Sequence, residues 1–384
     1  MDAVVIGGGI VGVAAAHALA DRDVDVTVLE RDALGTGSTA RSAGGIRTQF
    51  STPVNVRLSL ASLPVWENFE ERFGVDIGFH QHGYLFLARE DATAARFEEN
   101  VAMQRGLGVD VDRLSPAEAA EICPGLRTDR FTAATYNARD GYADPNLAVQ
   151  GYAAAARELG AELRTEVAVR DLHMEGGRVV GVETADGRID TDVVINAAGA
   201  WARTVGEMAG RSLPIAPRRR QVAVVEPGGG IPADLPLTID MDTGSYFRPE
   251  GEDTALVGGH FAETDLDVDP DSYPTSMDFD WASTALERAA DYATYFGEES
   301  RLKRGWAGLY AVTPDHHPIV EETVPGLITA AGFSGHGFQH APATARSVAE
   351  LVLDGGPSIE GVTSLTSDRF GDDADGGLVE RNVA

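Results

Sequence analysis

The fold of this chain is decided by the stretch Ala3-Val4-Val5-Ile6-Gly7-Gly8-Gly9-Ile10-Val11-Gly12, in which four apolar residues lead into spaced glycines. It predicts a β-strand, a tight turn and a helix that ends near residue 20. In this arrangement Gly7 permits the turn, Gly9 lets backbone N–H groups approach a pyrophosphate, and Gly12 lets the helix pack closely on the strand. The N-terminus of the helix adds unpaired donors and the positive end of a dipole. We therefore predict a dinucleotide-binding site.

A second strand, predicted at residues 26–29, supports this interpretation. It delivers Glu30 close to the spacing of about 20 residues at which a carboxylate accepts hydrogen bonds from an adenosine ribose. A glycine motif alone is weak, because glycine-rich turns without a ligand are common. The strand before the motif and Glu30 after it make the pattern specific for a dinucleotide. The spacing leaves open whether that dinucleotide is NAD or FAD.

Length and cysteine content limit the class of protein. A chain of 384 residues can hold two domains or one large discontinuous domain. No apolar run is long enough to span a bilayer, because charged residues or glycines interrupt every candidate. The chain starts inside its first predicted strand, which leaves no room for a signal peptide, so we expect a soluble cytoplasmic protein. Cys123 is the single cysteine, which excludes an internal disulfide and a cysteine metal cluster.

The charge balance is strongly acidic. The chain has 60 Asp and Glu residues against 31 Lys and Arg residues, a formal net charge of -29, and Lys303 is its single lysine. Such a surface repels nucleic acid and anionic membranes, so neither is expected as a partner. Self-repulsion destabilises the folded state in dilute buffer, and concentrated salt screens it. The composition resembles that of proteins from halophilic archaea. An acidic interaction surface is less favoured, because the acids are scattered.

The remaining sequence predicts a mixture of helices and strands. We expect helices at 54–73, 92–105, a short stretch after Ser115-Pro116, 145–159, 280–296 and 343–354. We expect strands at 83–88, 163–174, 178–185, 188–190, 193–196, 217–226, 245–259 and 327–332. A glycine-rich turn is expected from Phe333 to His340. Residues from about 367 onwards are acidic and glycine-rich, which is typical of a frayed tail.

Five motifs follow one another in an order that resembles a known family. Each is weak alone, but the ordered set resembles the D-amino acid oxidase superfamily of FAD-dependent amine oxidoreductases over residues 1–360. The chain is most similar to the branch of sarcosine oxidase, dimethylglycine dehydrogenase and the proline dehydrogenase β-subunit. The motifs are Gly7-x-Gly9-x-x-Gly12 with Glu30, Ser38-Thr39-x-x-Ser42-x-Gly44, Asn196-Ala197-Ala198-Gly199-Ala200-Trp201, Trp306-Ala307-Gly308-Leu309-Tyr310 with Thr313-Pro314-Asp315, and Gly332-Phe333-Ser334-Gly335-His336-Gly337-Phe338.

The resemblance implies an α/β fold, α+β overall, with a Rossmann-like FAD-binding domain that is discontinuous in sequence. That domain would comprise residues 1–80, 142–215 and 308–366. A substrate domain built on a mostly antiparallel sheet would comprise residues 81–141 and 216–307, and residues 367–384 would form the acidic tail. The flavin would lie at the junction of the two domains.

The resemblance also implies which residues hold FAD. Gly7, Gly9 and Gly12 would cradle the pyrophosphate, Glu30 would hold the adenosine ribose, and Val167 would lie beside the adenine. The turn after residue 332 would run beside the isoalloxazine ring, where backbone donors stabilise negative charge on the reduced ring. The other cofactor contacts implied in this way are Ile10, Val11, Arg31, Ser38, Thr39, Arg41, Ser42, Ala43, Gly44, Ala198, Gly199, Trp201, Gly308, Gly332, Phe333, Ser334, Gly335, His336, Gly337, Phe338 and Gln339.

The chain departs from its relatives at several positions. D-amino acid and glycine oxidases carry an arginine after Ala-Gly-Leu that clamps the substrate carboxylate, and this chain has Tyr310 there. Monomeric sarcosine oxidases carry a flavin-linking cysteine and a lysine where this chain has Gly308 and Gln339, so we expect non-covalent FAD. Those oxidases also use a lysine four residues before a histidine to promote reaction with oxygen. Here Leu256 precedes His260, which favours a dehydrogenase over an oxidase.

The implied reaction is hydride transfer from the carbon beside an amine nitrogen to flavin N5, giving an imine that water hydrolyses. A substrate carboxylate needs a bidentate guanidinium, for which Arg47 is the first choice and Arg248 the second. For either arginine the alternative is an ordinary exposed or ion-paired residue. Imidazoles titrate near working pH and are candidates to tune the amine or the flavin. The candidate catalytic residues are Arg47, Arg248, Tyr246, Tyr310, His260, His336 and Gln339.

Three functions remain in competition. The first is oxidation of a small amine or amino acid, of the sarcosine, dimethylglycine, proline or D-amino acid type, with O2 or an electron-transfer protein as acceptor. The second is a flavin-bearing electron-relay subunit of a multi-subunit amine dehydrogenase, which would need a partner subunit; a homo-oligomer is also possible. The third, an NAD-dependent dehydrogenase, is disfavoured by the glycine-rich turn at 332–337. No metal is expected, because His316 and His317 point oppositely on an extended segment and lack a third ligand.

Overall fold

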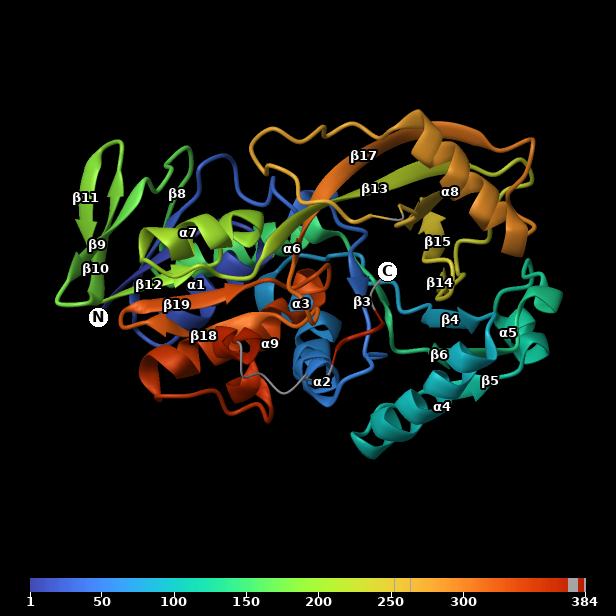
Figure 1. Cartoon of the computed structure of the whole chain (residues 1–384), viewed down its shortest axis with the longest axis horizontal. Helices are drawn as coiled ribbons and strands as arrows, with labels where there is room; N and C mark the ends of the chain where they lie inside the picture. Colours follow the sequence, from blue (N-terminus) through green and yellow to red (C-terminus); the bar gives the residue numbers. More distant parts are fainter. Residues whose placement is uncertain (252, 263, 372–378, 383–384) are drawn as a thin grey trace.

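Two large sheets organise the chain, and helices pack on both (Figure 1). The computed structural model describes residues 1–251, 253–262, 264–371 and 379–382. Two long strands of the second sheet, β13 (Ala216–Glu226) and β17 (Arg301–Val312), run across the top of Figure 1 from the region of the first sheet to the far end of the second. Within the described residues, no helix is both long and apolar enough to cross a bilayer.

The first sheet has six strands, and its order is β18-β19-β12-β1-β2-β8. Strand β1 (Asp2–Ile6) lies between β2 (Asp25–Leu29) and β12 (Val193–Asn196), and both pairings are parallel. β8 (Glu162–Arg164) and β19 (Leu327–Ala331) extend the parallel part, and β18 (Ile319–Val324) adds an antiparallel edge. The chain therefore leaves β1 at the centre of the sheet, where ligands bind in open α/β sheets.

Alternation of apolar side chains gives this sheet two buried faces. Val5 and Val28 pack against α1 (Ile10–Ala20), α6 (Pro145–Glu158) and α9 (Gly337–Leu353). Val4 and Ile6 point to the opposite face. That face is covered by a small antiparallel sheet and a short helix, namely β9 (Asp171–Glu175), β10 (Arg178–Thr184), β11 (Gly187–Asp190) and α7 (Ala202–Met208).

The second sheet has eight strands in the order β17-β13-β16-β15-β14-β4-β6-β5. All of its pairings are antiparallel except the parallel pair of β4 (Tyr84–Ala88) and β14 (Leu237–Asp240). The predicted combination of a mainly parallel sheet with a mostly antiparallel one is thus confirmed. The remaining strands are β5 (Asp112–Leu114), β6 (Ala133–Asn137), β15 (Ser245–Glu250) and β16 (Thr254–Gly259).

One face of the second sheet forms a core and the other reaches the first sheet. Phe247 packs in the core beneath α5 (Pro116–Ile122) and α8 (Phe279–Tyr292). The adjacent Tyr246 points the other way, into a cluster that α4 (Asp91–Gly106) covers in part. Between the sheets lie α2 (Pro53–Glu67), α3 (Phe69–Phe73) and the two-residue pairing of β3 (Gly45–Ile46) with β7 (Gly141–Tyr142).

Several element predictions were wrong. The strand expected at 163–174 is two strands in different sheets, because Glu166 takes a positive φ of 61° and turns the chain between β8 and β9. The strand expected at 245–259 is likewise divided into β15 and β16 by the turn at Gly251. Helix α8 ends at Tyr292, before the expected residue 296.

The region after β19 also differs from its prediction. Helix α9 begins at Gly337, within the turn expected from Phe333 to His340, and it accommodates Pro342. The expected frayed tail is wrong at its end: Glu380 is fully buried and Asn382 is 6% exposed. Residues 372–378 and 383–384 of that tail lie outside the described residues.

Candidate active site

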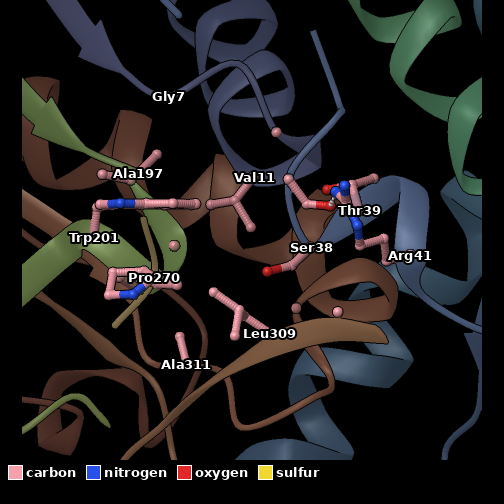
Figure 2. Close-up of a pocket in the computed structure, with 18 of the residues that line it drawn as sticks. Gly7, Val11, Ser38, Thr39, Arg41, Ala197, Trp201, Pro270, Leu309 and Ala311 are labelled. Carbon is pink, nitrogen blue, oxygen red and sulfur yellow. Dashed lines mark hydrogen bonds between the residues drawn. The ribbon is translucent and has the colours of Figure 1, made fainter. Parts of the chain in front are cut away.

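A cavity of about 800 Å³ lies where the two sheets meet, at the carboxyl ends of β1, β2 and β12. Both sheets contribute to its wall. The first supplies the glycine turn and Glu30, and the second supplies Val222, Tyr246 and Leu309. Figure 2 shows the arrangement of the labelled side chains: Trp201 and Pro270 lie on one side of the cavity and Ser38, Thr39 and Arg41 on the other.

The glycine turn forms one wall of this cavity. A Cβ atom at Gly7 would lie 2.6 Å from the carbonyl oxygen of Ala197, and Gly7 has a φ of 105°. A Cβ atom at Gly12 would lie 1.9 Å from the carbonyl oxygen of Gly7, so the absence of a side chain at Gly12 lets α1 pack closely against the turn. Gly9 faces the cavity and precedes α1 without a side-chain cap. The start of α1 therefore presents backbone donors and a positive dipole end to the cavity.

Glu30 shapes the same turn. Its Oε2 atom accepts a hydrogen bond of 2.7 Å from the backbone N–H of Gly8, and its Oε1 atom accepts one of 2.8 Å from that of Asp32. Each carboxylate oxygen has a second acceptor position. Glu30 can therefore brace the turn and still accept a hydrogen bond from a ligand in the cavity.

A loop of the second sheet closes the cavity from outside. Asp271 on this loop pairs with Arg31 at 2.6 Å and accepts a hydrogen bond of 2.8 Å from the indole N–H of Trp201. The Arg31 guanidinium lies 4.2 Å from the centre of the Trp201 ring. Hydrogen bonds from Arg31 and Trp201 lower the pKa of Asp271. Residues far apart in sequence thus join the two sheets across the cavity, a contact that the sequence analysis missed.

A smaller cavity of about 80 Å³ adjoins the first, and Ser42, Tyr246 and Tyr310 line both. Arg47 and His336 face it, while an apolar wall comes from β14 and the residue after it. Among the described residues that line this cavity, none is Asp, Glu or Lys. The lining also includes Ala43, Gly44, Gly45, Tyr84, Leu237, Ile239, Met241, Ser334, Gly335, Phe338, Gln339 and Asn382.

Arg47 is the charged group of the smaller cavity, with 8% of its surface exposed. Its Nη1 donates to the carbonyl of Gln49 at 2.8 Å, and its Nη2 donates to the carbonyl of Asn382. The guanidinium lies 4.1 Å from the centre of the Phe50 ring. Within the described part of the chain, no carboxylate comes within ion-pair distance of it. Burial lowers the pKa of Arg47, while the nearby carboxylates of Glu380 and Asp140 act to raise it.

Hydrogen bonds fix the tautomer of His336. Its Nε2 must donate to the carbonyl of His316 at 2.9 Å, because a carbonyl only accepts. Its Nδ1 therefore accepts from Nδ1 of His340 at 3.1 Å, and Nε2 of His340 accepts from the hydroxyl of Ser59 at 2.9 Å. Burial holds the pKa of His336 well below its usual range. His336 is thus a neutral ring with both nitrogens occupied, which makes it unsuited to act as a base.

The two phenols at the boundary of the cavities are neutral as well. Burial raises the pKa of Tyr246 well above its usual range and also raises that of Tyr310. Each can donate a hydrogen bond at neutral pH. Gln339 has a structural contact, since its Oε1 accepts a hydrogen bond of 2.7 Å from the backbone N–H of Arg47.

Comparison with known proteins identifies the family. Residues 2–351 match the family model of FAD dependent oxidoreductases. The chain belongs to this family of FAD-dependent oxidoreductases. It is 33% identical to FAD-dependent oxidoreductase domain-containing protein 1 of Xenopus laevis, across 100% of this chain and 84% of that relative.

Two further members of the family are informative. The crystal structure of L-proline dehydrogenase from P. horikoshii superposes with a TM-score of 0.88 and 35% identity, across 96% of this chain and 97% of that one. Human mitochondrial dimethylglycine dehydrogenase is 29% identical across 96% of this chain, which covers 44% of that relative's length. The predicted relationship to this branch of the FAD-dependent oxidoreductases is confirmed.

The larger cavity of this oxidoreductase fits FAD. Its wall holds the starts of two helices, α1 and α9, which suit the pyrophosphate and the electron-rich edge of a flavin. The hydroxyl oxygen of Ser42 is buried and, among the described residues, has no hydrogen-bond partner. Such a buried polar atom needs a partner, and a cofactor can supply one.

Most of the predicted cofactor residues meet in the larger cavity, and their contacts with FAD remain predictions. Gly44, His336 and Gln339 line the smaller cavity instead, and Gly12 packs behind the turn. The predicted residues in the larger lining are Gly7, Gly9, Ile10, Val11, Glu30, Arg31, Ser38, Thr39, Arg41, Ser42, Ala43, Val167, Ala198, Gly199, Trp201, Gly308, Gly332, Phe333, Ser334, Gly335, Gly337 and Phe338.

Two candidate catalytic residues lie outside both linings. Arg248 is on the same face of β15 as Tyr246 but about 7 Å further along the strand, where it pairs with Glu250 at 2.7 Å. His260 follows the end of β16 and lies 3.5 Å from Asp265. Burial lowers the pKa of His260. Of the two candidate arginines, Arg47 lines the smaller cavity and Arg248 lines neither.

The two adjacent histidines make contacts of a structural kind. His316 donates from Nδ1 to the carbonyl of Glu380 at 3.0 Å, and Nδ1 of His317 lies 3.2 Å from the amide nitrogen of Asn55. The described residues contain no group of three His, Cys, Asp or Glu side chains that could hold a metal ion.

Proposed function

We propose that this protein oxidises a small amino acid or N-methyl amino acid at the carbon next to nitrogen, by hydride transfer to flavin N5. The product is an imine that water hydrolyses. The observation that carries this proposal is Arg47, a buried guanidinium beside the FAD cavity whose described contacts are backbone carbonyls and aromatic rings. The names of the similar L-proline and dimethylglycine dehydrogenases agree with such a substrate.

Bound FAD supplies the hydride acceptor, and the residues of the chain orient the substrate. Arg47 binds the substrate carboxylate through paired N–H donors. The hydrocarbon part of the substrate packs on Leu237, Ile239 and Met241. The positive field of Arg47, with no carboxylate in the described lining to oppose it, favours the neutral amine over the ammonium form. That neutral amine is the form whose lone pair assists departure of the hydride.

The FAD is proposed to be held without a cysteine linkage. Cys123, the single cysteine, is fully buried in the core beneath the second sheet and lines neither cavity. Precipitation of the protein with acid should therefore release free flavin into the supernatant. Flavin that stays with the precipitate would contradict this part of the proposal.

The proposal is tested by anaerobic reduction of the flavin with proline, sarcosine and dimethylglycine. Arg47→Ala leaves the substrate carboxylate without its partner, which costs about 2 to 5 kcal/mol and lowers kcat/KM by roughly 30-fold or more. Arg47→Lys should restore a part of this loss, because a point charge lacks the planar fork. Arg157→Ala is the matched control, as it removes an exposed arginine of α6 that lines neither cavity.

A comparison on the substrate side gives an independent check. Pyrrolidine is proline without its carboxylate, so Arg47→Ala should affect pyrrolidine far less than proline. Normal reduction of the flavin by proline in Arg47→Ala would refute the role of Arg47. A flavin that none of the amines reduces would favour the electron-relay function instead.

A further inference from the structure

The segment from Val379 to Asn382 lies beside the proposed substrate site, with the side chains of Glu380 and Asn382 inside the protein and those of Val379 and Arg381 exposed. Glu380 is fully buried and Asn382 is 6% exposed. In Figure 1 the red trace of this segment lies next to β3, the strand that leads to Arg47. Asn382 is also part of the lining of the smaller cavity. A frayed tail would not be expected to make such contacts.

Glu380 anchors the segment through both carboxylate oxygens. Oε1 accepts from the backbone N–H and the hydroxyl of Ser51 at 2.8 and 2.6 Å. Oε2 accepts from the hydroxyl of Thr52 at 2.6 Å and the amide of Asn55 at 3.1 Å. Burial alone would raise the pKa of Glu380, but these hydrogen bonds lower it. The buried group is therefore a well-satisfied carboxylate.

Asn382 contacts the guanidinium of Arg47 directly. Its carbonyl accepts from Nη2 of Arg47, and its amide donates to the carbonyl of Gln49 at 3.2 Å. Nη1 of Arg47 donates to that same carbonyl of Gln49 at 2.8 Å. The guanidinium thus lies between the backbone carbonyls of Gln49 and Asn382. The side-chain amide of Asn382 also donates to the Gln49 carbonyl, which links the two acceptors. A guanidinium has five N–H donors, so these two carbonyls leave three of them unused.

We infer that the segment from Glu380 to Asn382 is part of the substrate site, in which it positions the Arg47 guanidinium for the substrate carboxylate. This inference rests on the proposed function. The Asn382 carbonyl is the orienting acceptor, and Glu380 holds the segment in place. The Asn382 carbonyl carries no formal charge, so it orients the guanidinium without pairing with its charge, whereas the Glu380 carboxylate acts on Arg47 only through space. The segment therefore acts on affinity for the carboxylate and not on the flavin chemistry itself.

The test uses the FAD-loaded full chain and propionate, a carboxylate with no amine to oxidise. Its Kd is measured from the shift of the flavin absorbance bands. Glu380→Ala, and a chain shortened after residue 378, should raise this Kd about tenfold or more. Asn382→Gly keeps the orienting carbonyl but loses the bond to Gln49, and a smaller increase is expected. Arg381→Ala, which removes an exposed side chain from the same segment, is the matched control and should bind propionate normally.

Turnover gives a second readout that a purely structural role would not move. In Glu380→Ala the KM for proline should rise more than that for pyrrolidine, because pyrrolidine has no carboxylate to place. Unchanged or tighter binding of propionate in both Glu380→Ala and the shortened chain would overturn the inference. Arg47→Ala separates the two proposals: normal propionate binding in that variant overturns the proposed function. Weaker propionate binding in Arg47→Ala, with normal binding in Glu380→Ala and in the shortened chain, would overturn the positioning role alone.

Discussion

The substitutions Gly12→Ala and Gly9→Ala each add one methyl group to the glycine turn. The surroundings of the two positions differ. At Gly12 the new Cβ would lie 1.9 Å from the carbonyl oxygen of Gly7, and ordinary contact starts at 3.4 Å. The first turn of α1 must therefore move away by about 1.5 Å, an overpacking that costs about 3 kcal/mol. The better helix propensity of alanine offsets about 1 kcal/mol. We expect the cofactor-free protein to lose about 2 kcal/mol of its free energy of unfolding.

Gly9 has ordinary backbone angles, a φ of -74° and a ψ of 177°. A Cβ there would have the hydroxyl of Thr39, at 3.4 Å, as its nearest protein neighbour. The change should therefore reduce the stability of the cofactor-free protein by less than about 1 kcal/mol, through the weaker N-cap preference of alanine. The methyl group would instead enter the space proposed for the pyrophosphate. A steric clash there that costs about 1 to 3 kcal/mol raises the Kd for FAD roughly fivefold to 150-fold.

Two measurements separate these effects. Urea unfolding of the cofactor-free protein reports the free energy of unfolding, and quenching of flavin fluorescence reports the Kd for FAD. Gly12→Ala should move the first, and Gly9→Ala should move the second. Normal FAD affinity in Gly9→Ala would refute the placement of the pyrophosphate. Equal losses of stability in both variants would refute the distinction between the two glycines.

Two further predictions concern salt and pH. With a net charge of -29 the melting temperature should rise steeply from dilute buffer to molar KCl, and a flat profile would show that the acids are locally compensated. Asp140, which follows β6, is fully buried and accepts hydrogen bonds from Thr48 and Gln49. Burial raises its pKa to about 6, so between about pH 4 and 6 the folded state binds more protons than the unfolded state and the free energy of unfolding falls as pH rises. Urea unfolding should show that the free energy of unfolding falls by roughly 3 kcal/mol more in the wild type than in Asp140→Asn over this pH range. Equal pH profiles of the two proteins would contradict the prediction.

Local patterns were enough to predict the part of the fold that depends on neighbours in sequence. The first strand, the glycine turn, the first helix and Glu30 lie within 30 residues, and their periodicity and turn chemistry agree with the structure. The split between β8 and β9 escaped prediction, because both halves read as strand and the turn at Glu166 carries no glycine. The start of α9 was placed too late, because glycines and Pro342 are poor helix signals.

The contacts that complete the two cavities could not be read from sequence. Asp271 meets Arg31 across 240 positions, and nothing near Asp271 marks it as part of a cavity. The segment around Glu380 has the composition of a tail, yet Ser51, Thr52 and Asn55 supply the donors that bury it. Arg47 itself was predicted from its position after the second loop, but its contacts with the carbonyls of Gln49 and Asn382 needed the structure.

The central place of β1 in the first sheet has a consequence for biosynthesis. Its partner β12 lies almost 190 residues later in the chain, and β19 and α9 follow only after residue 326. At about 5 to 20 residues per second, a ribosome needs roughly 10 to 40 seconds to deliver β12 after β1. The glycine turn therefore stays incomplete until β12 has been made. FAD can find its full site only after the start of α9 at Gly337 has been made, so cofactor loading follows the synthesis of both large sheets.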